Sequence, residues 1–142
     1  MSLISDLVEQ HQEIFAGAVR STPDALRLVE ETLNVKLPND VIWFLTSCGV
    51  ASTAAVSNER AVISDTMRYR EATGLPKHFV VLNDRNDAGT VFLDTRSELG
   101  AVAWVDSHAI YAFALETIQP SEYDAYPSFL AWVTDCIKEI ED

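Results

Sequence analysis

The feature that most constrains the fold is a set of three short β-rich runs separated by links of only a few residues. The runs are HFVVLND (78–84), GTVFLDT (89–95) and GAVAWVD (100–106). Each run is rich in β-branched or aromatic residues and is bounded by turn-forming residues, which is typical of strands. Links this short cannot hold a parallel crossover. The runs therefore predict an antiparallel meander.

Two other segments are also expected to contain strands. The run AIYAFALETI (109–118) is expected to extend the sheet. Residues 50–63 are small and apolar, with a polar break at SNER (57–60), and are expected to form one or two short strands. A short helix should then follow, with Ser64 as its N-cap and Gly74 as its stop.

The N-terminal and C-terminal segments show helical periodicity instead. Apolar residues recur every three or four positions over 3–19 and over 128–140, which predicts amphipathic helices. Another helix is expected to begin at Pro23, where no N–H is needed, with Thr22 as its N-cap. His11 falls on or near the first apolar stripe, where a partly buried histidine is favoured over a ligand.

The segment VKLPNDVIWFLTSCG (35–49) predicts a central packing helix. Leu37 precedes a proline and is therefore extended, and Pro38 begins the helix. Five consecutive apolar residues (41–45) make its interior apolar nearly all round, which indicates burial between other elements. Gly49 suits the left-handed position that ends a helix.

The order of helices, sheet and helix predicts a single α+β domain over residues 1–142, with N-terminal helices and a C-terminal helix packed on a largely antiparallel sheet. A chain of this length can bury a hydrophobic core. The N-terminus has no basic segment before an apolar one, and no apolar run approaches the roughly 20 residues that cross a bilayer. We therefore expect a cytoplasmic protein.

The chain is strongly acidic, with a net charge of −12. Residues 72–142 hold 12 acidic and 4 basic residues, hence −8 of this total. Such a surface repels phosphate backbones and anionic membranes, so direct binding to nucleic acid or membrane is not expected. The charge has two interpretations: solubility alone, or attraction of a basic protein partner.

The cysteines and the longest turn indicate neither a nucleophile nor a metal site. Cys48 is expected at a helix C-terminus and Cys136 inside the last helix, and both are poor settings for a thiolate. DRNDAG (84–89) begins like a calcium loop. Ala88 at its fifth position and Thr95 at its twelfth remove ligands that such a loop needs. We expect no cofactor.

Four aspartates lie near the ends of the predicted strands: Asp84, Asp87, Asp94 and Asp106. Paired carboxylates can perform acid–base chemistry, which leaves an enzyme as a remote alternative. Aspartate is also common in turns for local reasons, because its side chain hydrogen-bonds to its own backbone. Hairpins would hold the four on one or both rims of the sheet, where they would steer a basic partner inward. They are the predicted partner-binding residues.

The segment VEETLNVKLPNDVIWFLTSCG (29–49) resembles the signature of the SUKH superfamily, the Smi/Knr-like proteins. The pattern is an acidic helix, a Val-x-Leu-Pro step, an acidic-aromatic helix and a glycine. The matching residues are Glu31, Leu33, Val35, Leu37, Pro38, Asp40, Phe44, Leu45 and Gly49. VVLNDRNDAGTVFLDT (80–95) and YPSFLAWV (126–133) resemble later parts of the pattern, so the similarity covers about residues 24–140. SCGVAS (47–52) departs from it, because family members often carry Asn-Gly or Gly-Gly there.

The resemblance implies an α+β fold without catalytic residues. Bacterial members resemble immunity proteins, which are small cytoplasmic domains that bind and neutralise a cognate toxin, often a nuclease or deaminase. The leading hypothesis is therefore a non-enzymatic immunity protein whose acidic face occludes the basic cleft of a toxin. A regulatory or scaffold domain that binds a non-toxin partner remains the alternative.

Overall fold

The computed structural model describes residues 3–15, 19–48, 56–85, 89–116 and 123–141. The helices are α1 (Leu3–Gln10), α2 (Gln12–Phe15), α3 (Pro23–Leu33), α4 (Asn39–Ser47), α5 (Glu59–Thr73), the 3-10 turn η2 (Ser107–Ala109), α6 (Ile110–Ala114) and α7 (Phe129–Glu141). The strands are β1 (Phe79–Asp84), β2 (Thr90–Asp94), β3 (Val102–Val105) and β4 (Asp124–Tyr126).

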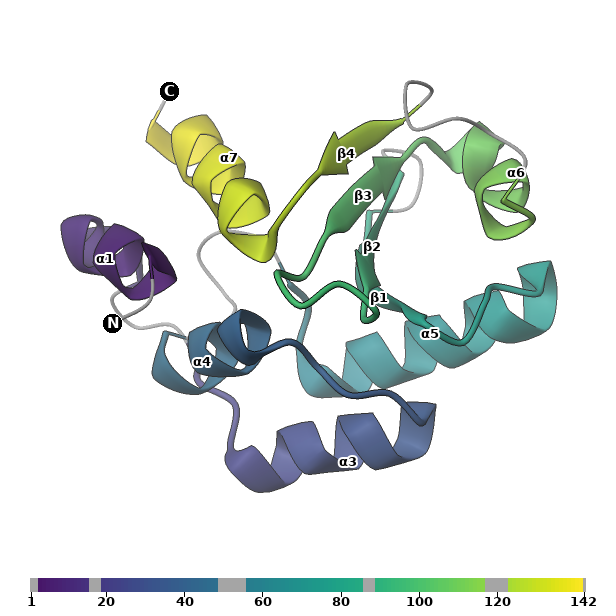
Figure 1. The fold of residues 1–142 in the computed structure, drawn as a ribbon, viewed down its shortest axis with the longest axis horizontal. Helices are drawn as coiled ribbons and strands as arrows, with labels where there is room; N and C mark the ends of the chain where they lie inside the picture. Colours follow the sequence, from purple (N-terminus) through teal and green to yellow (C-terminus); the bar gives the residue numbers. More distant parts are fainter. Residues whose placement is uncertain (1–2, 16–18, 49–55, 86–88, 117–122, 142) are drawn as a thin grey trace.

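The described strands form one sheet in the order β1-β2-β3-β4, and every neighbouring pair is antiparallel. The predicted meander and the predicted α+β class are both confirmed. Helices α1, α4 and α7 lie on one side of the sheet and α6 on the other (Figure 1). Helix α5 packs along β1, and α3 packs against α5.

The run at 109–118 does not extend the sheet, so that prediction is wrong. It contributes α6 instead, directly after η2. Ile110 and Phe113 are buried three residues apart while Tyr111 between them is exposed, which is a helical rather than an alternating period. The fourth strand is the short β4, whose Ala125 pairs with Ala103 of β3.

The strands expected at 50–63 are also not found where the structure describes this segment, because α5 already begins at Glu59. The N-cap is Asn58 rather than Ser64, since the Asn58 side chain accepts a hydrogen bond from the Ala61 N–H at 2.9 Å. This hydrogen bond satisfies one of the unpaired N–H donors at the start of α5 and stabilises the helix there. The small apolar residues of the segment favoured strands, but the capped helix forms instead. Gly74 ends the helix at φ 73°, as predicted.

The first predicted helix is divided into α1 and α2 at His11. Thr22 caps α3 as predicted, because its hydroxyl accepts a hydrogen bond from the Ala25 N–H at 3.1 Å. Helix α4 starts directly after Pro38, which also agrees with the prediction. The predicted stop at Gly49 lies outside the described residues.

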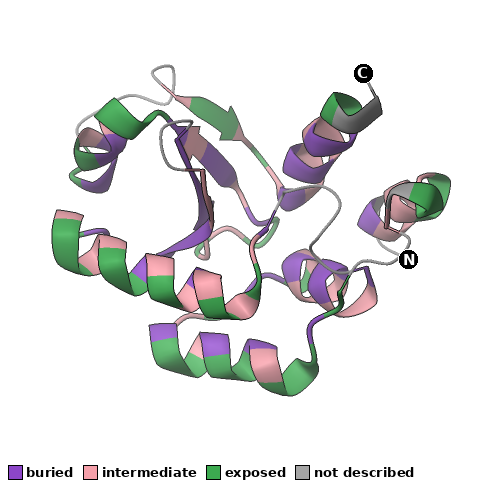
Figure 2. Cartoon of the chain, turned by 180° about the vertical axis from the view of Figure 1, so that it is seen from behind, coloured by how far each residue is buried: buried purple, intermediate pink, exposed green. Residues whose placement is uncertain are grey.

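Alternation along the strands gives the sheet two faces with separate cores. The helical face carries Val80, Leu82, Val91, Leu93 and Val102, which join a large cluster with residues of α1, α3, α4 and α7. The α6 face carries Phe79, Val81, Phe92, Ala103 and Val105, which join a smaller cluster with α6. Figure 2 shows the helices with buried stripes directed inward and exposed stripes directed outward.

The outer edge of β1 is closed by hydrogen bonds from neighbouring segments. The Val81 N–H donates to the buried hydroxyl of Thr66 on α5 at 2.9 Å, and the Ser57 N–H donates to the Leu82 carbonyl at 2.7 Å. These bonds fix α5 against the sheet.

Candidate functional site

A cavity of about 410 Å³ lies over the α6 face of the sheet. Its floor is a cross-strand row in which Phe92, Ala103 and Ala125 are successive partners on β2, β3 and β4. Side chains in such a row point to the same face. The row changes from large to small side chains at β3, so the methyl groups of the two alanines leave space that α6 does not fill.

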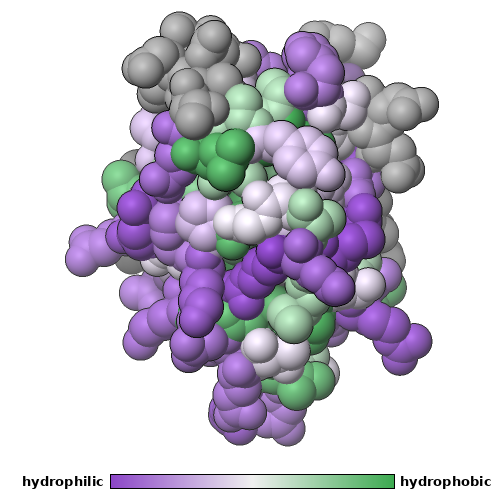
Figure 3. Space-filling view, turned by 90° about the vertical axis from the view of Figure 1, so that its right-hand side faces the viewer, coloured by the Kyte–Doolittle hydropathy of each residue, from purple (hydrophilic) through white to green (hydrophobic). Residues whose placement is uncertain are grey.

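Aromatic rings form the walls of the cavity. The rings of Phe92 and Phe113 are stacked with centroids 4.7 Å apart. Tyr123 meets Phe113 edge-on at 5.1 Å, and Phe79 lies 4.9 Å from Phe113. Figure 3 views this side of the molecule and shows hydrophobic and weakly polar side chains along the middle, with hydrophilic side chains on both flanks. The walls are therefore largely apolar. Phe92 and Phe113 are almost fully buried, and Tyr123 is the more exposed of these rings.

Asp94 and Arg96 form a bidentate ion pair at the mouth of the cavity. Arg96 Nε lies 3.1 Å from Asp94 Oδ1 and Arg96 Nη2 lies 3.0 Å from Oδ2. The Arg96 N–H also donates to Oδ1 at 3.0 Å within the turn that follows β2. Burial raises the pKa of Asp94, but these hydrogen bonds and the Arg96 charge outweigh it and the pKa is lowered. The carboxylate is therefore ionised, with Arg96 as its counter-ion.

Glu116 and His78 face each other at the same mouth. Glu116 follows α6 in a left-handed conformation (φ 58°), and its N–H donates to the Phe113 carbonyl. Its Oε1 lies 3.7 Å from His78 Nε2, which is buried and makes no hydrogen bond. Burial lowers the pKa of His78, assisted by the Arg96 charge and opposed by Asp94 and Glu116. His78 is therefore neutral at neutral pH, and two carboxylates face one guanidinium.

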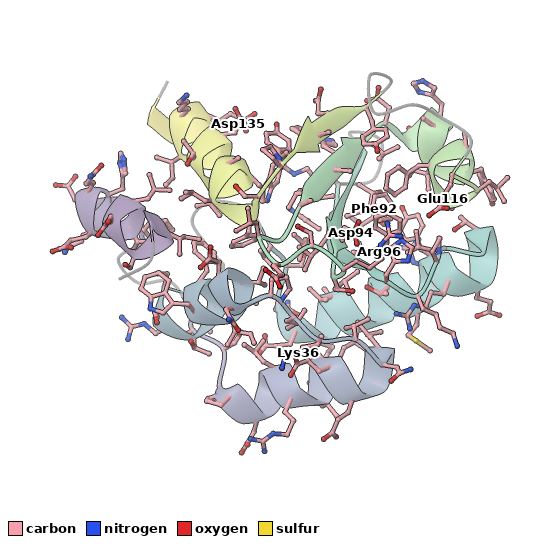
Figure 4. All side chains as sticks on the ribbon, in the orientation of Figure 1. Lys36, Phe92, Asp94, Arg96, Glu116 and Asp135 are labelled. Carbon is pink, nitrogen blue, oxygen red and sulfur yellow. The ribbon has the colours of Figure 1, made fainter. Side chains whose placement is uncertain are left out.

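Tyr126 closes the end of the cavity that is nearest α7. Its hydroxyl donates to Asp135 Oδ2 at 2.9 Å, and its ring lies 5.1 Å from the Trp132 ring. Burial, followed by this hydrogen bond and the nearby negative charge, raises the pKa of Tyr126. Figure 4 shows Phe92, Asp94, Arg96 and Glu116 together between the sheet and α6, with Asp135 apart on α7.

A second hollow of about 600 Å³ lies between the α3–α4 link and the β2–β3 hairpin. Lys36 and Asp40 from the Leu-Pro step line one wall, and Arg96 and Glu98 line the other. Arg96 thus borders both hollows, while Lys36 lies well away from the cavity in Figure 4. Positive and negative groups are balanced here, so this hollow favours neither a cationic nor an anionic ligand.

The structure places the three described members of the predicted aspartate set on both rims of the sheet. Asp84 pairs with Thr90 at one rim, and the exposed Asp106 directly follows β3 at that rim. Asp94 pairs with Phe79 at the opposite rim. Asp87 lies outside the described residues.

The described aspartates differ in exposure and in their partners. The Asp84 side chain is only 8% exposed and forms an ion pair with Arg68. Asp94 is paired with Arg96, as described above. Asp106 is the one of the three whose residue is exposed.

The sequence predicted one of the four titratable groups at this mouth, Asp94, and missed Arg96, Glu116 and His78. Asp94 was predicted from its position at a strand end. Arg96 lies two residues further on in the same turn. The pair could have been predicted, because an Asp-x-Arg sequence in a turn allows the bidentate geometry. Glu116 lies in the run that was taken for a strand, and His78 is joined to it only through the tertiary structure.

The thiols lie in the core of the helical face. Cys48 and Cys136 are both buried. Burial raises the pKa of Cys48, and it raises the pKa of Cys136 to about 12. Within the described part of the chain, no three His, Cys, Asp or Glu side chains are grouped so that they could hold a metal ion.

Comparison with known families places the chain. The family described as SMI1-KNR4 cell-wall, of the SUKH superfamily, matches residues 2–138. The chain belongs to this SUKH family. The match takes in the Leu-Pro step, the meander and nearly all of α7, and it confirms the resemblance noted in the sequence. No curated protein matches the chain. None of the helices in the described ranges is both long enough and apolar enough to span a membrane.

Proposed function

We propose that this SUKH protein is a non-enzymatic immunity protein of the bacterial cytoplasm. It binds a cognate toxin domain of the nuclease or deaminase type and occludes the basic active cleft of that toxin. The observation that carries the proposal is the combination of a −12 net charge with an aromatic cavity whose mouth holds two carboxylates. A toxin that acts on nucleic acid needs a basic cleft, and an acidic surface complements it.

The proposed interface includes both rims of the sheet. Asp94 stands at the cavity mouth, while Asp84 and Asp106 lie at the other rim. Asp87 belongs to the set by its sequence position between β1 and β2. Carboxylates spread over two rims act together through their field rather than through individual contacts. A single exposed ion pair contributes only about 0–1 kcal/mol, so the four residues have to be tested as a set.

The test is surface plasmon resonance against the product of an adjacent toxin gene at several salt concentrations. The variant D84N/D87N/D94N/D106N should associate several-fold more slowly than the natural chain. The rate difference should shrink as salt shortens the Debye length from about 10 Å at 0.1 M to about 3 Å at 1 M. Circular dichroism checks that the loss of the Arg68–Asp84 pair has not unfolded the variant.

A matched control neutralises four acidic residues on the helices instead. Glu9, Glu13, Asp24 and Glu31 are all exposed on α1, α2 and α3, so E9Q/E13Q/D24N/E31Q changes the net charge by the same amount. Association should fall much less for this control. If both variants slow association equally, the rims have no special role, and if neither does, the interface does not depend on acidic steering.

The second candidate is a regulatory domain that binds a non-toxin partner, which the cell-wall description of the matched family favours. The two candidates differ in the partner. Affinity capture on the immobilised chain, followed by identification of the captured protein and an inhibition assay, distinguishes them. An immunity protein captures a toxin and abolishes its catalytic activity. A regulatory domain captures a partner that is not a toxin.

A further inference from the structure

We propose that the cavity on the α6 face is a socket for one cationic side chain, an arginine or lysine, that protrudes from the partner. The inference rests on the proposed protein-binding function and names the chemistry recognised at its centre. Arginine and lysine share a positive charge on a flexible stem, and the experiment below separates them.

The walls suit a cation better than an uncharged group. Tyr123 is a partly exposed ring of this space, whereas Phe92 and Phe113 are 0% and 4% exposed and form its apolar lining. An aromatic face attracts a cation that lies within about 6 Å of its centroid. The guanidinium of arginine also stacks on aromatic planes. The floor at Ala103 and Ala125 is apolar and shallow, so the stem of a long side chain can lie on it.

The charge at the mouth selects the same ligand. Arg96 directs both Nε and Nη2 to Asp94, so its charge is already compensated. Glu116 lies 3.7 Å from His78 and within the field of Arg96, and its side chain is 56% exposed, so Arg96 faces two carboxylates. One excess negative charge therefore remains at the opening. An incoming cation meets Glu116 at the mouth and the aromatic rings below it.

The volume fits a side chain together with some water. Ligand cavities range from about 300 to 1,000 Å³, and this one measures about 410 Å³. Tyr123 and Ala125 bring the exposed β4 beside the cavity, so the backbone of a partner has access to the opening. A partner residue that enters here is partly desolvated, which strengthens its attraction to the carboxylates.

The experiment is a ¹H–¹⁵N NMR titration of the chain with N-acetylarginine amide. The neutral isostere N-acetylcitrulline amide is the matched control, and N-acetyllysine amide with a free ε-amine is the second cationic arm. We expect the arginine probe to shift the amides of Asp94, Ala103 and Glu116, and its own methylene protons to move upfield over the rings. Binding of citrulline at equal strength, or shifts confined to other surfaces, would overturn the proposal.

Two variants define the sign of the charge that the cavity selects. Glu116→Gln should weaken binding of the arginine probe about two- to fivefold, because one exposed carboxylate is lost. Arg96→Gln should strengthen it by a similar factor, because Asp94 is released from its counter-ion. An anion site would respond to Arg96→Gln in the opposite direction, so weaker binding there contradicts the proposal. Glu98→Gln, an exposed change on the same hairpin outside this cavity, is the control and should have no effect.

A filling variant links the cavity to the partner. Ala125 is exposed and lines the cavity, so Ala125→Phe should block the probe without lowering the melting temperature. The same variant should accelerate dissociation of the toxin. Loss of probe binding with unchanged toxin affinity separates the two proposals, because the socket then exists but lies outside the toxin interface. If Ala125→Phe folds and still binds the probe, the socket is not in this cavity.

Discussion

The two faces of the sheet are formed by alternate residues of the same strands, yet they are covered very differently. The helical face packs against α1, α3, α4 and α7, and its core includes Phe44, Phe129 and Trp132. The α6 face is covered by the five-residue α6 and the end of α5, and it retains a cavity of about 410 Å³. The difference shows that one side of the meander is closely packed while the other keeps space for a ligand.

The cause of the difference is the size of the side chains on each face. At β2 and β3 the helical face presents Leu93 opposite Val102, and four helices fill the space beyond them. The α6 face presents Phe92 opposite Ala103, followed by Ala125. A short helix cannot reach over both alanines. Four predictions test whether the two faces differ in this way.

The largest effect is expected in the core of the helical face. Phe44 is fully buried and meets the rings of Phe15 and Phe129 edge-on at 5.6 and 5.4 Å. Phe44→Ala should lower the free energy of unfolding by about 3–5 kcal/mol. Phe113→Ala on the α6 face should cost less, because part of that ring already borders the cavity. Urea denaturation of both variants measures the contrast, and equal losses would mean that the two faces are equally packed.

The second-largest loss of stability is expected from alanine substitutions at two glycines. Gly74 and Gly100 both have φ 73°, so an alanine at either position is strained. A Cβ at Gly74 would meet nothing within 4 Å, whereas at Gly100 it would lie 3.1 Å from the Phe129 Cβ. Gly100→Ala should therefore be about 1 kcal/mol more destabilising than Gly74→Ala. Thermal denaturation is the measurement, and identical melting temperatures would show that the helical face has room at this point.

A smaller effect on stability is expected when the pH is lowered, because His78 beside the cavity becomes protonated. Burial and Arg96 hold the pKa of His78 below its usual value, against Asp94 and Glu116, so the unfolded chain binds the proton more readily. The stability that this provides is complete above about pH 6.5 and is lost as pH falls through the lowered pKa. His78→Gln should remove this segment of the melting-temperature profile, with the exposed His108→Gln as control. An unchanged profile would mean that His78 is not desolvated.

No effect at all is expected from a thiol reagent on the native chain. Cys48 and Cys136 both lie in the core of the helical face, and burial raises the pKa of each thiol. The thiolate is the reactive form, so labelling at neutral pH should require denaturant. Mass spectrometry after brief exposure to iodoacetamide measures the extent of cysteine labelling. Rapid labelling without denaturant would show that the helical face opens easily.

The sequence predicted the elements whose signals are local. Alternation and short links are sufficient for the β1–β3 meander, and Thr22 with Pro23 identifies the start of α3 because a cap acts on its own helix. The errors occurred where composition was ambiguous between helix and strand. Residues 110–114 are apolar in either period, and the Asn58 cap lies in a segment whose small residues suggested strands.

The candidate site was the least predictable part. Asp94 was identified from its turn, but its ion pair with Arg96 requires the side chains to be placed. The cavity itself depends on Ala103 and Ala125, two residues 22 positions apart that become neighbours only through β3–β4 pairing. No local signal marks an alanine as the floor of a cavity.

The sequence by itself determined the fold class, the family and the acidic charge, because hydrophobic period, capping residues and composition act over a few residues or over the whole chain. Only the tertiary structure decided which face of the sheet is filled and which is hollow. That choice depends on which helices reach each face and on the sizes of side chains brought together across strands. His78 and Glu116, 38 residues apart, meet at 3.7 Å for the same reason, because the residue that follows α6 lies beside the start of β1.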